Sequence, residues 1–519
     1  MSSDQTVICI GAGPAGLTAG YLLGKAGVAV TVLEADPVYV GGISRTATWK
    51  GFSFDIGGHR FFSKSQEVEA LWDELLPHDF LERPRKSRIF YSGKLFDYPL
   101  RAFDALSKLG IVEAARCVLS YARVRLNPGP APANFEEWVT QRFGTRLFQI
   151  FFRTYTEKVW GMKCTEISAD WAAQRIKGLS LTTAIWHALL PQKSDVPRDQ
   201  MVKTLIDSFR YPRKGPGMLW DAAAARIRDQ GGKVLMGQHV SSVERLADGR
   251  WQVTSTTADG SELVRNADHV ISTMPMRELA RALQPPVPSA VARAAEALRY
   301  RDFLVVALII KDRDLFDDNW IYIHDPDVKV GRIQNFKSWS PEMVPDAALN
   351  CYGMEYFCFE GDGVWAADDA ELVTMASAEL VKLGLADAAD IVEGTVVRQP
   401  KAYPVYDADY QDHVDVMRSG LDAQYPGLHL IGRNGMHKYN NQDHAMMTAM
   451  LTVRNILAGE QLYDVWQVNQ DAEYHEDGAA GTQQAIDPSK RPALTGGELA
   501  ALASERRVPV SPAIAVPGE

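Results

Sequence analysis

The sequence predicts an α/β protein in which a Rossmann-like, doubly wound nucleotide-binding domain carries an inserted substrate domain of antiparallel strands and helices. Two observations support this fold class. A strand, a glycine loop, a helix and a second strand follow one another at the N-terminus, and β-rich runs recur beyond a long helical block. The 519 residues are enough for two or three domains with a large buried core.

The N-terminal unit has the order of elements that binds dinucleotides. Residues 7–10 are an apolar run of strand length, residues 17–26 have the pattern of a helix, and residues 28–33 are a second apolar run that ends at Glu34. Between the first strand and the helix lies the G-x-G-x-x-G sequence of residues 11–16. In this context the motif is the dinucleotide-binding fingerprint, and Glu34 is placed to accept hydrogen bonds from a ribose.

Each residue of the glycine loop has a physical reason. Gly11 permits a tight turn, Gly13 lets the backbone approach a pyrophosphate, and Gly16 lets the helix pack closely on the strand. Pro14 and Ala15 begin the helix, whose free N–H groups and positive dipole end favour a bound phosphate.

Two further glycine pairs follow. The pair that ends at Gly42 lets the backbone pass close to a ligand held by the first loop, and Arg45 can reach a phosphate. A short alternating strand then leads into Gly57, Gly58 and His59, where a titratable ring stands beside another point of close backbone approach. An ordinary loop histidine is the alternative for His59.

The rest of the chain alternates between helical and β-rich segments. A helical block from residue 100 to about 171, with a capping-box pattern at Asn134 and Glu137, is expected to cap the nucleotide domain. The elements expected around it are a hairpin at 88–96, a helix at 219–228, a β-meander at 233–275, a central strand at 303–310, strands of a second, antiparallel sheet at 320–323, 332–336 and 349–359, a strand at 428–432 and a helix at 444–458. Residues 467–519 have the composition of a disordered tail.

Composition and charge argue against several classes of protein. A formal net charge of −10 argues against a nucleic-acid-binding protein. Five cysteines without a C-x-x-C pair indicate reduced thiols in a cytoplasmic protein, and no run approaches the ~20 apolar residues of a membrane span. His437 and His444 lack a third ligand at a suitable spacing, so no metal site is predicted.

Several of these segments together resemble the FAD-binding clan of amine oxidases and protoporphyrinogen oxidases. They are the fingerprint, the Gly41-Gly42 pair, the segment 233–240 that ends at Val240, and the late Gly432-Arg433 pair. The resemblance implies FAD as the cofactor, with Val240, Gly432 and Arg433 among its contacts. It also implies a discontinuous FAD-binding domain of residues 1–75, 203–275 and 405–466, and a substrate domain of residues 76–202 and 276–404.

Within this clan, further stretches are similar to UDP-galactopyranose mutase. Residues 54–59 resemble the loop beside the flavin, and residues 151–161 resemble a nucleotide-stacking helix, with Phe151, Tyr155 and Trp160 in the matching positions. The positions that match two diphosphate-binding arginines and two tyrosines are Arg175, Arg332, Tyr403 and Tyr439. Gln442 and Asp443 match the helix start that faces the flavin. Tyr98 and Arg101 lie near the expected base site, where the closest mutases carry an uncharged amide in place of Arg101, so the nucleobase is left open.

The resemblance implies a redox-neutral pyranose–furanose mutase that acts on a nucleotide-diphosphate sugar through N5 of reduced FAD. His59, Arg175, Arg332, Tyr403 and Tyr439 would be its catalytic residues. Its partners would be the nucleotide sugar and a reductant such as NAD(P)H or a reduced flavoprotein, with homo-oligomerisation left open. The alternative is an FAD-dependent oxidase, dehydrogenase or desaturase.

Purely structural roles for the same residues also stay open. Phe151, Tyr155 and Trp160 could instead pack in a core, since positions 151 and 155 are a helical i, i+4 pair, and Arg175 and Arg332 could each form a surface salt bridge.

Overall fold

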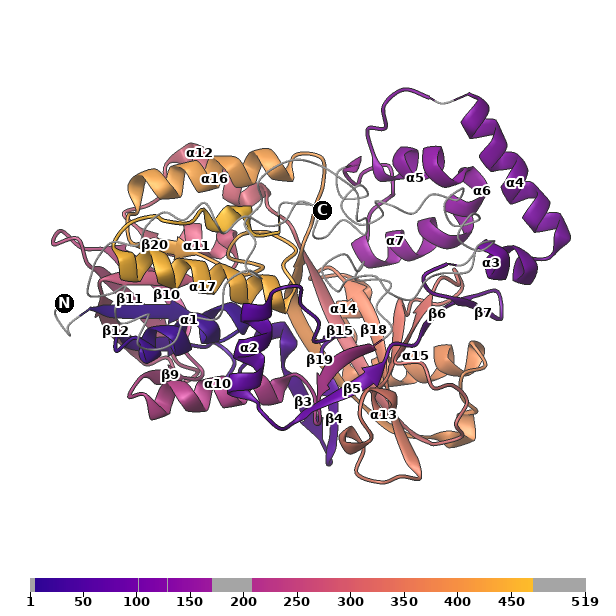
Figure 1. The fold of residues 1–519 in the computed structure, drawn as a ribbon, viewed down its shortest axis with the longest axis horizontal. Coiled ribbons are helices and arrows are strands. Elements are labelled where there is room, and N and C mark those ends of the chain that lie inside the picture. Colours follow the sequence, from indigo (N-terminus) through magenta and orange to yellow (C-terminus); the bar gives the residue numbers. More distant parts are fainter. Residues whose placement is uncertain (1–4, 101, 128, 170–207, 470–519) are drawn as a thin grey trace.

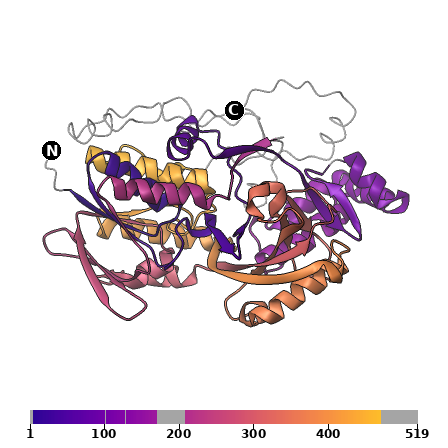
Figure 2. The same ribbon diagram turned by 90° about the horizontal axis from the view of Figure 1, so that it is seen from below.

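The computed structural model describes residues 5–100, 102–127, 129–169 and 208–469. The predicted site residues Arg101 and Arg175, and the tail from residue 470, lie outside the described residues. The described chain forms two halves that lie side by side, with a helical lobe attached to one of them (Figure 1, Figure 2).

The first half is built on a five-stranded parallel sheet. Its order is β20 (Leu428–Leu430), β13 (His269–Ser272), β1 (Thr6–Ile10), β2 (Ala29–Leu33) and β9 (Lys233–Leu235). Side chains alternate along β1, so that Val7 and Cys9 face one core while Ile8 and Ile10 face another. Both faces of the sheet are therefore covered, as the near-continuous apolar sequence of its strands requires.

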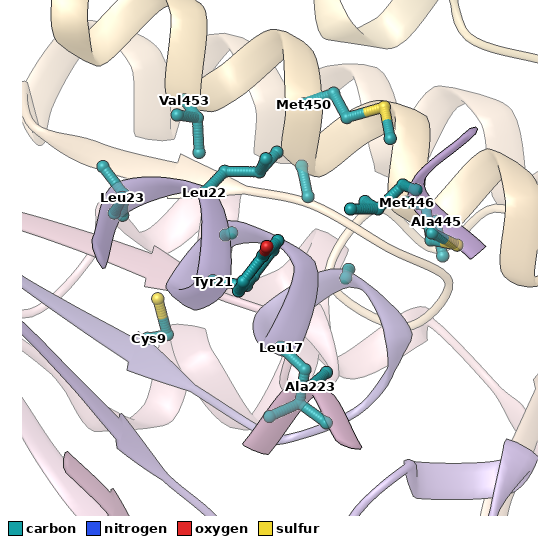
Figure 3. Packing of buried hydrophobic residues seen from close by; sticks show 14 of the residues in the cluster. Cys9, Leu17, Tyr21, Leu22, Leu23, Ala223, Ala445, Met446, Met450 and Val453 are labelled. Atoms are coloured by element: carbon teal, nitrogen blue, oxygen red, sulfur yellow. The ribbon is translucent and has the colours of Figure 1, made fainter. Parts of the chain in front are cut away.

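Four helices cover the Cys9 face: α1 (Pro14–Lys25), α2 (Gln66–Leu75), α10 (Gly217–Asp229) and α17 (Gln442–Ala458). Figure 3 shows Leu22 and Tyr21 of α1 facing Met446 and Met450 of α17. Nearly every residue of α17 is buried, which makes it the central helix of this half.

The opposite face carries a four-stranded sheet and three helices. They are β10 (His239–Arg245), β11 (Trp251–Thr256), β12 (Glu262–Ala267), β14 (Leu283–Gln284), α11 (Met276–Ala282), α12 (Ser289–Ala297) and α16 (Tyr410–Gln424). Met276 and Val291 share a core with Ile8 and Ile10. The packing therefore places α11 and α12 with the nucleotide-binding half, beyond the expected boundary at residue 275.

The second half is a seven-stranded sheet. Its order is β19 (Ile391–Pro404), β15 (Tyr300–Lys311), β18 (Leu349–Cys358), β17 (Arg332–Asn335), β16 (Trp320–Ile323), β6 (Ser87–Tyr91) and β7 (Lys94–Asp97). The β6–β7 hairpin is as predicted, and β15 is an interior strand, paired on both sides, although it lies second from the edge. The strands expected to form an antiparallel sheet, β16, β17 and β18, do pair antiparallel with one another, and the parallel pairing in this sheet is the one between β16 and β6. The long strand β19 was missed, since its polar residues interrupt the apolar pattern.

Shorter elements complete the two halves. They are η1 (Gly42–Ser44), β3 (Thr46–Trp49), β4 (Phe52–Asp55), β5 (Phe80–Pro84), β8 (Ser208–Pro212), α13 (Phe336–Trp339), η5 (Pro341–Met343), α14 (Gly363–Ala366), α15 (Asp369–Lys382), η6 (Ala388–Asp390) and η7 (Val465–Gln467). Helix α15 begins at a full capping box between Asp368 and Glu371. In the described ranges, no helix is both long enough and apolar enough to pass through a bilayer.

The helical lobe has its own core. It consists of α3 (Ala102–Leu109), α4 (Ile111–Leu126), α5 (Phe135–Phe143), α6 (Thr145–Phe148), a π-helical turn η2 (Gln149–Arg153) and α7 (Thr154–Trp160). Asn134 caps α5 as predicted, because its side chain accepts the N–H of Glu137 at 3.0 Å. The Glu137 carboxylate accepts from Ala133 instead of Asn134, so the capping box is displaced by one residue.

Candidate active site

The first two glycine loops meet at the carboxyl ends of the parallel strands. Gly11 leaves β1 with a φ of +96°, and a Cβ on Gly16 would lie 1.9 Å from the carbonyl oxygen of Gly11. Helix α1 can therefore start against the strand only because Gly16 has no side chain. A Cβ on Gly42 would lie 3.4 Å from Cα of Gly13, which places the second loop directly against the first.

Arg45 lies beside the meeting point of these loops. Its Nη1 donates to the carbonyl oxygen of Gly42 at 3.0 Å and to Gln399, and its Nε lies 3.9 Å from Asp36. A guanidinium held there adds positive charge next to the N-terminus of α1. Burial lowers the pKa of Arg45, although the side chain remains a cation at neutral pH.

Glu34 closes the end of β2. Its carboxylate accepts the N–H of Ala12 at 2.6 Å and the N–H of Asp36 at 2.9 Å, and its carbonyl oxygen accepts the N–H of Gln238 at 2.7 Å. Burial raises the pKa of Glu34. The contact with Gln238 brings the start of β10, with the buried Val240, alongside the acid.

The last glycine turn completes the nucleotide site. Gly432, with a φ of +80°, follows β20, and a Cβ there would lie 3.1 Å from Cβ of Ala15. Arg433 donates to the carbonyl oxygens of Asn440 and Ala402 at 2.9 and 3.2 Å. The predicted cofactor residues of β1, β2, β20 and α1 thus converge on one edge of the sheet, where open α/β sheets bind their ligands.

A cavity lies next to this edge, between the two halves of the molecule. It is formed by the loop after β4, the strands β16, β17 and β19, and the segment that leads into α17. Its lining residues are Gly57, Gly58, His59, Arg60, Phe62, Tyr322, Arg332, Tyr403, Arg433, Tyr439, Asn441, Gln442 and Asp443.

Arg332 projects into the cavity from β17. Its Nε donates to the carboxylate of Glu355, a fully buried residue of β18 that also accepts from Gln334 at 2.9 Å. Burial acts to lower the pKa of Arg332, but Glu355 outweighs it and keeps the pKa above its usual value. Among the described residues, none accepts a hydrogen bond from Nη1 or Nη2 of Arg332, and Nη2 lies 3.8 Å from the point where Gly57 would carry a Cβ.

Tyr403 and Tyr439 form the facing wall. Their rings are stacked with centroids 5.6 Å apart and an interplanar angle of 11°. The Arg433 guanidinium lies 5.3 and 4.9 Å from the two ring centroids, within cation–π range. Burial raises the pKa of Tyr403, so its hydroxyl remains a donor at neutral pH.

His59 is neutral at physiological pH. Burial lowers its pKa to about 4, despite a hydrogen bond to Ile56 that acts to raise it, and Arg433 and Arg332 lower it further. Nε2 lies 3.0 Å from the carbonyl oxygen of Ile56, which can only accept, so this nitrogen carries the proton. The ring therefore holds the shape of the loop that contains Gly57 and Gly58.

Helix α17 begins at the cavity. Its N-cap residue Asn441 makes no side-chain capping bond, so the first N–H groups of a buried helix are directed at this region. Nε2 of Gln442 donates to the carbonyl oxygen of Arg60 at 3.2 Å, whereas the buried Oε1 of Gln442 has no partner in the described part of the chain. A buried acceptor of this kind fits a site that a ligand completes.

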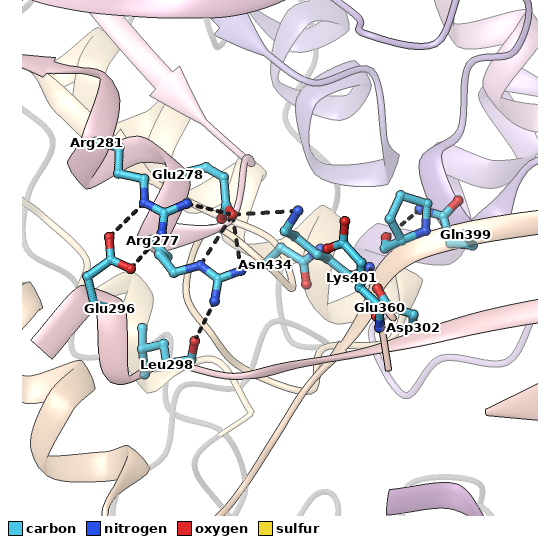
Figure 4. Close-up of polar contacts among 11 residues, drawn as sticks. Arg277, Glu278, Arg281, Glu296, Leu298, Asp302, Glu360, Gln399, Lys401 and Asn434 are labelled. Carbon is cyan, nitrogen blue, oxygen red and sulfur yellow. Dashed lines mark hydrogen bonds and ion pairs between the residues drawn. The ribbon is translucent and has the colours of Figure 1, made fainter. Parts of the chain in front are cut away.

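Asp302 sets the position of Tyr403 from the neighbouring strand. Its carboxylate accepts the N–H of Lys401 at 2.7 Å and the N–H of Glu360 at 2.6 Å. Here residues 400–402 of β19 oppose Asp302 alone, and Lys401 has a φ of +51°. The bulge lies in a polar network that reaches α11, because Nζ of Lys401 is 3.5 Å from Glu278 (Figure 4).

Comparison with known proteins decides the family. The flavin-containing amine oxidoreductase family matches residues 14–457, which is most of the chain. The chain belongs to this family. The protein is therefore an FAD-dependent flavoprotein, and the glycine loops, Arg45 and the start of α17 are the residues that fit this cofactor.

Solved structures share the fold of the flavoprotein. Reduced UDP-galactopyranose mutase has a TM-score of 0.76 and 21% identity, covering 91% of this chain and 96% of that one. A putative protoporphyrinogen oxidase from Exiguobacterium sp. 255-15 has a TM-score of 0.64 and 17% identity, covering 86% and 97%. Putrescine oxidase has a TM-score of 0.57 and 17% identity, covering 86% and 98%.

The three aromatic residues proposed to stack on a base lie in different surroundings. Tyr155 stacks on His324 with centroids 4.9 Å apart, and it meets the cavity residue Tyr322 edge-on at 5.4 Å. Tyr98 packs on the other side of Tyr322 at 4.8 Å. Phe151 and Trp160 are each only 3% exposed and belong to the core of the helical lobe.

The predicted site residues did not include Arg60, Phe62 and Tyr322 of the cavity lining, nor Glu355 behind it, and two of these carry a signal in the sequence. Tyr322 belongs to the run Trp320-Ile321-Tyr322-Ile323, whose alternation places its aromatic members on the opposite face from the isoleucines. Glu355 is the lone carboxylate in the otherwise uncharged strand β18. An isolated acid in such a strand signals a buried cationic partner, which here is Arg332.

Proposed function

We propose that this flavoprotein is a redox-neutral mutase that acts on a nucleotide-diphosphate sugar. The observation that carries the proposal is the guanidinium of Arg332, which lines the cavity with its Nε held by Glu355 while neither terminal nitrogen donates to a described residue. Such a planar fork matches the oxygens of a diphosphate.

The surrounding residues suit a leaving diphosphate. Tyr403 and Tyr439 would donate their hydroxyl protons to its oxygens, and the second arginine of the proposal, Arg175, would share its charge. Tyr155 and Tyr322, with Tyr98 behind them, would form the wall against which a nucleobase stacks. Glu355 orients Arg332 without meeting the substrate, because its side chain is fully buried.

Reduced FAD would supply an electron-rich ring nitrogen to the sugar and would undergo no net oxidation. On the protein side, the N-terminal end of α17 would offset negative charge on the reduced ring. The neutral His59 would keep Gly57 and Gly58 in place at the open side of the cavity. The absence of a side chain on Gly57 would leave room for the sugar between His59, Arg332 and Tyr403.

A specific observation also favours a second candidate, an FAD-dependent oxidoreductase. The matching family is described by amine oxidoreduction, and putrescine oxidase shares the fold. Such an enzyme would use the stacked pair Tyr403 and Tyr439 to receive an organic substrate, and its flavin would lose colour when that substrate is added without oxygen.

One experiment separates the two functions. The protein is incubated with a panel of nucleotide-diphosphate sugars, with and without prior reduction by dithionite, and the products are resolved by chromatography. A mutase converts a sugar only when reduced and consumes no electron donor in proportion to product. Conversion by the oxidised protein, with stoichiometric flavin reduction, would establish the oxidoreductase.

The Arg332→Lys variant tests whether diphosphate binding depends on the guanidinium fork. It keeps the charge and the pairing with Glu355 but loses the fork, so nucleoside-diphosphate affinity should fall by about tenfold to a hundredfold, as expected for one charge-assisted contact. The flavin spectrum should not change. Unaltered affinity in this variant would show that the diphosphate does not bind at Arg332 in this cavity.

A further inference from the structure

Helix α4 exposes an apolar face that none of the described residues covers. Its outward side chains include Ile111, Leu119 and Leu126, which are 90%, 70% and 87% exposed. The same helix exposes Val112 and Val118, so that five of the eleven exposed large hydrophobic residues in the described chain lie on this one element. Such a concentration marks an interaction surface.

The spacing of these residues gives the face a regular shape. At 3.6 residues per turn, the exposed apolar positions of α4 fall within an arc of about 120°. The opposite side of the helix faces the lobe core, where Cys117 is buried and Gly144 lies against the backbone at Tyr121. Helix α4 stands at the outer edge of the helical lobe, away from the cavity (Figure 1).

Basic residues flank both edges of this arc. Arg116 and Arg123 lie on one edge and Arg125 on the other, and all three are exposed. The single acid of the helix, Glu113, lies outside the arc and is paired with Arg146 and Arg116. The α4 face, defined by residues 111–126, is therefore apolar in the centre and positive at its borders, in a chain whose formal net charge is −10.

We propose that the α4 face docks the protein on an anionic phospholipid surface. An amphipathic helix with arginines beside its apolar face lies in the plane of a membrane interface, with the apolar side chains among the acyl chains and the guanidinium groups among the phosphates. A second copy of the chain is a less suitable partner for the α4 face than a phospholipid surface. A two-fold interface would pair the face with itself, and the face offers no free carboxylate to its own arginines.

Vesicle flotation tests this proposal with the full-length, FAD-loaded protein. It should float with phosphatidylcholine–phosphatidylglycerol vesicles at low salt, and less with pure phosphatidylcholine or at about 150 mM salt, because screening weakens surface electrostatics. The double variant Leu119→Glu/Leu126→Glu should lower the bound fraction about tenfold. Arg123→Gln/Arg125→Gln should reduce binding to the anionic vesicles specifically.

The matched control is Leu315→Glu/Val416→Glu, which places two glutamates at exposed apolar positions on other elements and should bind like the wild type. FAD absorbance and the thermal midpoint verify folding of every variant. Absence of flotation at low salt, or equal flotation of the Leu119→Glu/Leu126→Glu variant, overturns the proposal. A dimer in analytical ultracentrifugation that this variant abolishes, without vesicle binding, assigns the face to a second copy and also overturns it.

Discussion

The carboxylate of Asp302 accepts the backbone N–H of Lys401 at 2.7 Å and thereby fixes the bulge two residues before Tyr403. Beyond the bulge, β19 pairs with β15 again at Tyr403 and Pro404. Gln399, just before the bulge, accepts from Arg45, and Ala402, within it, accepts from Arg433. One strand therefore contacts the cofactor side and the substrate side of the site.

Replacing Asp302 with alanine should destabilise the fold and displace Tyr403. The partly buried N–H groups of Lys401 and Glu360 would lose a charged acceptor, and a hydrogen bond to a charged group contributes about 1.5–3 kcal/mol, less where water can replace the acceptor. Denaturant unfolding should show a loss of roughly 2–5 kcal/mol. Asp302→Asn retains one acceptor oxygen and should lose about half as much. Full stability of the alanine variant would show that the bulge does not depend on Asp302.

Substitutions at the second and third glycines of the fingerprint, Gly13 and Gly16, should fail in different ways. Gly16→Ala places a Cβ 1.9 Å from the Gly11 carbonyl oxygen, so it should lower the thermal midpoint even of the FAD-free protein. At Gly13 the nearest atom to a Cβ is 4.0 Å away, on Gly42. Gly13→Val should therefore fold but release its flavin, because the side chain occupies the path of the pyrophosphate. Absorbance at the flavin band, measured alongside unfolding, distinguishes the two results.

Replacing Tyr155 and replacing Trp160 should have different effects. Tyr155→Ala removes part of the proposed base-stacking wall, so nucleoside-diphosphate affinity should fall by about 1–3 kcal/mol with the flavin retained. Trp160→Ala opens the lobe core, where Trp160 stacks on Tyr406 at 6.4 Å, and should cost about 3–5 kcal/mol of stability. Titration calorimetry and denaturant unfolding measure these effects. A stable Trp160→Ala protein with weakened nucleotide binding would show that Trp160 contacts the nucleotide and is not a core residue.

Asp55 should make the protein less stable as the pH rises. It is buried beneath the Gly57 loop, where it accepts from Tyr211 and Thr46, and burial raises its pKa to about 7. Between the unfolded pKa of about 3.9 and this value, the folded state binds the extra proton, so stability falls from pH 4 to pH 7 by at most about 1.4 kcal/mol per unit. Thermal midpoints of the wild type and Asp55→Asn across this range isolate the effect. Parallel curves for the two proteins would contradict it.

Local patterns predicted most of the nucleotide-binding half. The glycine fingerprint and the acid at Glu34 depend on close approach within one βαβ unit, so a short stretch of sequence contains the required information. Helix α5 and the hairpin of β6 and β7 were predicted for the same reason, from a cap and a turn. The family resemblance brought Arg332, Tyr403 and Tyr439 into the site, and they do line one cavity.

What could not be predicted depends on contacts between distant segments. Strand β19 has no clean alternation, and it is a strand because it pairs with β15 over most of its length. The pairing of β16 with β6 joins residues far apart in the chain, and no local pattern specifies it. The family resemblance placed Trp160 at the nucleotide and yet this side chain lies in the core, since a matching position in the sequence does not determine what the side chain packs against.

The order of strands in the parallel sheet has a consequence for synthesis. Strand β1 ends at Ile10, whereas its neighbour β13 begins at His269 and the edge strand β20 begins at Leu428. At about 5–20 residues per second, a ribosome takes roughly 20–80 s to reach β20 after β1 has emerged. During that interval the apolar segment of β1 has no complete sheet to join, so the parallel sheet can be completed only after most of the protein has been made.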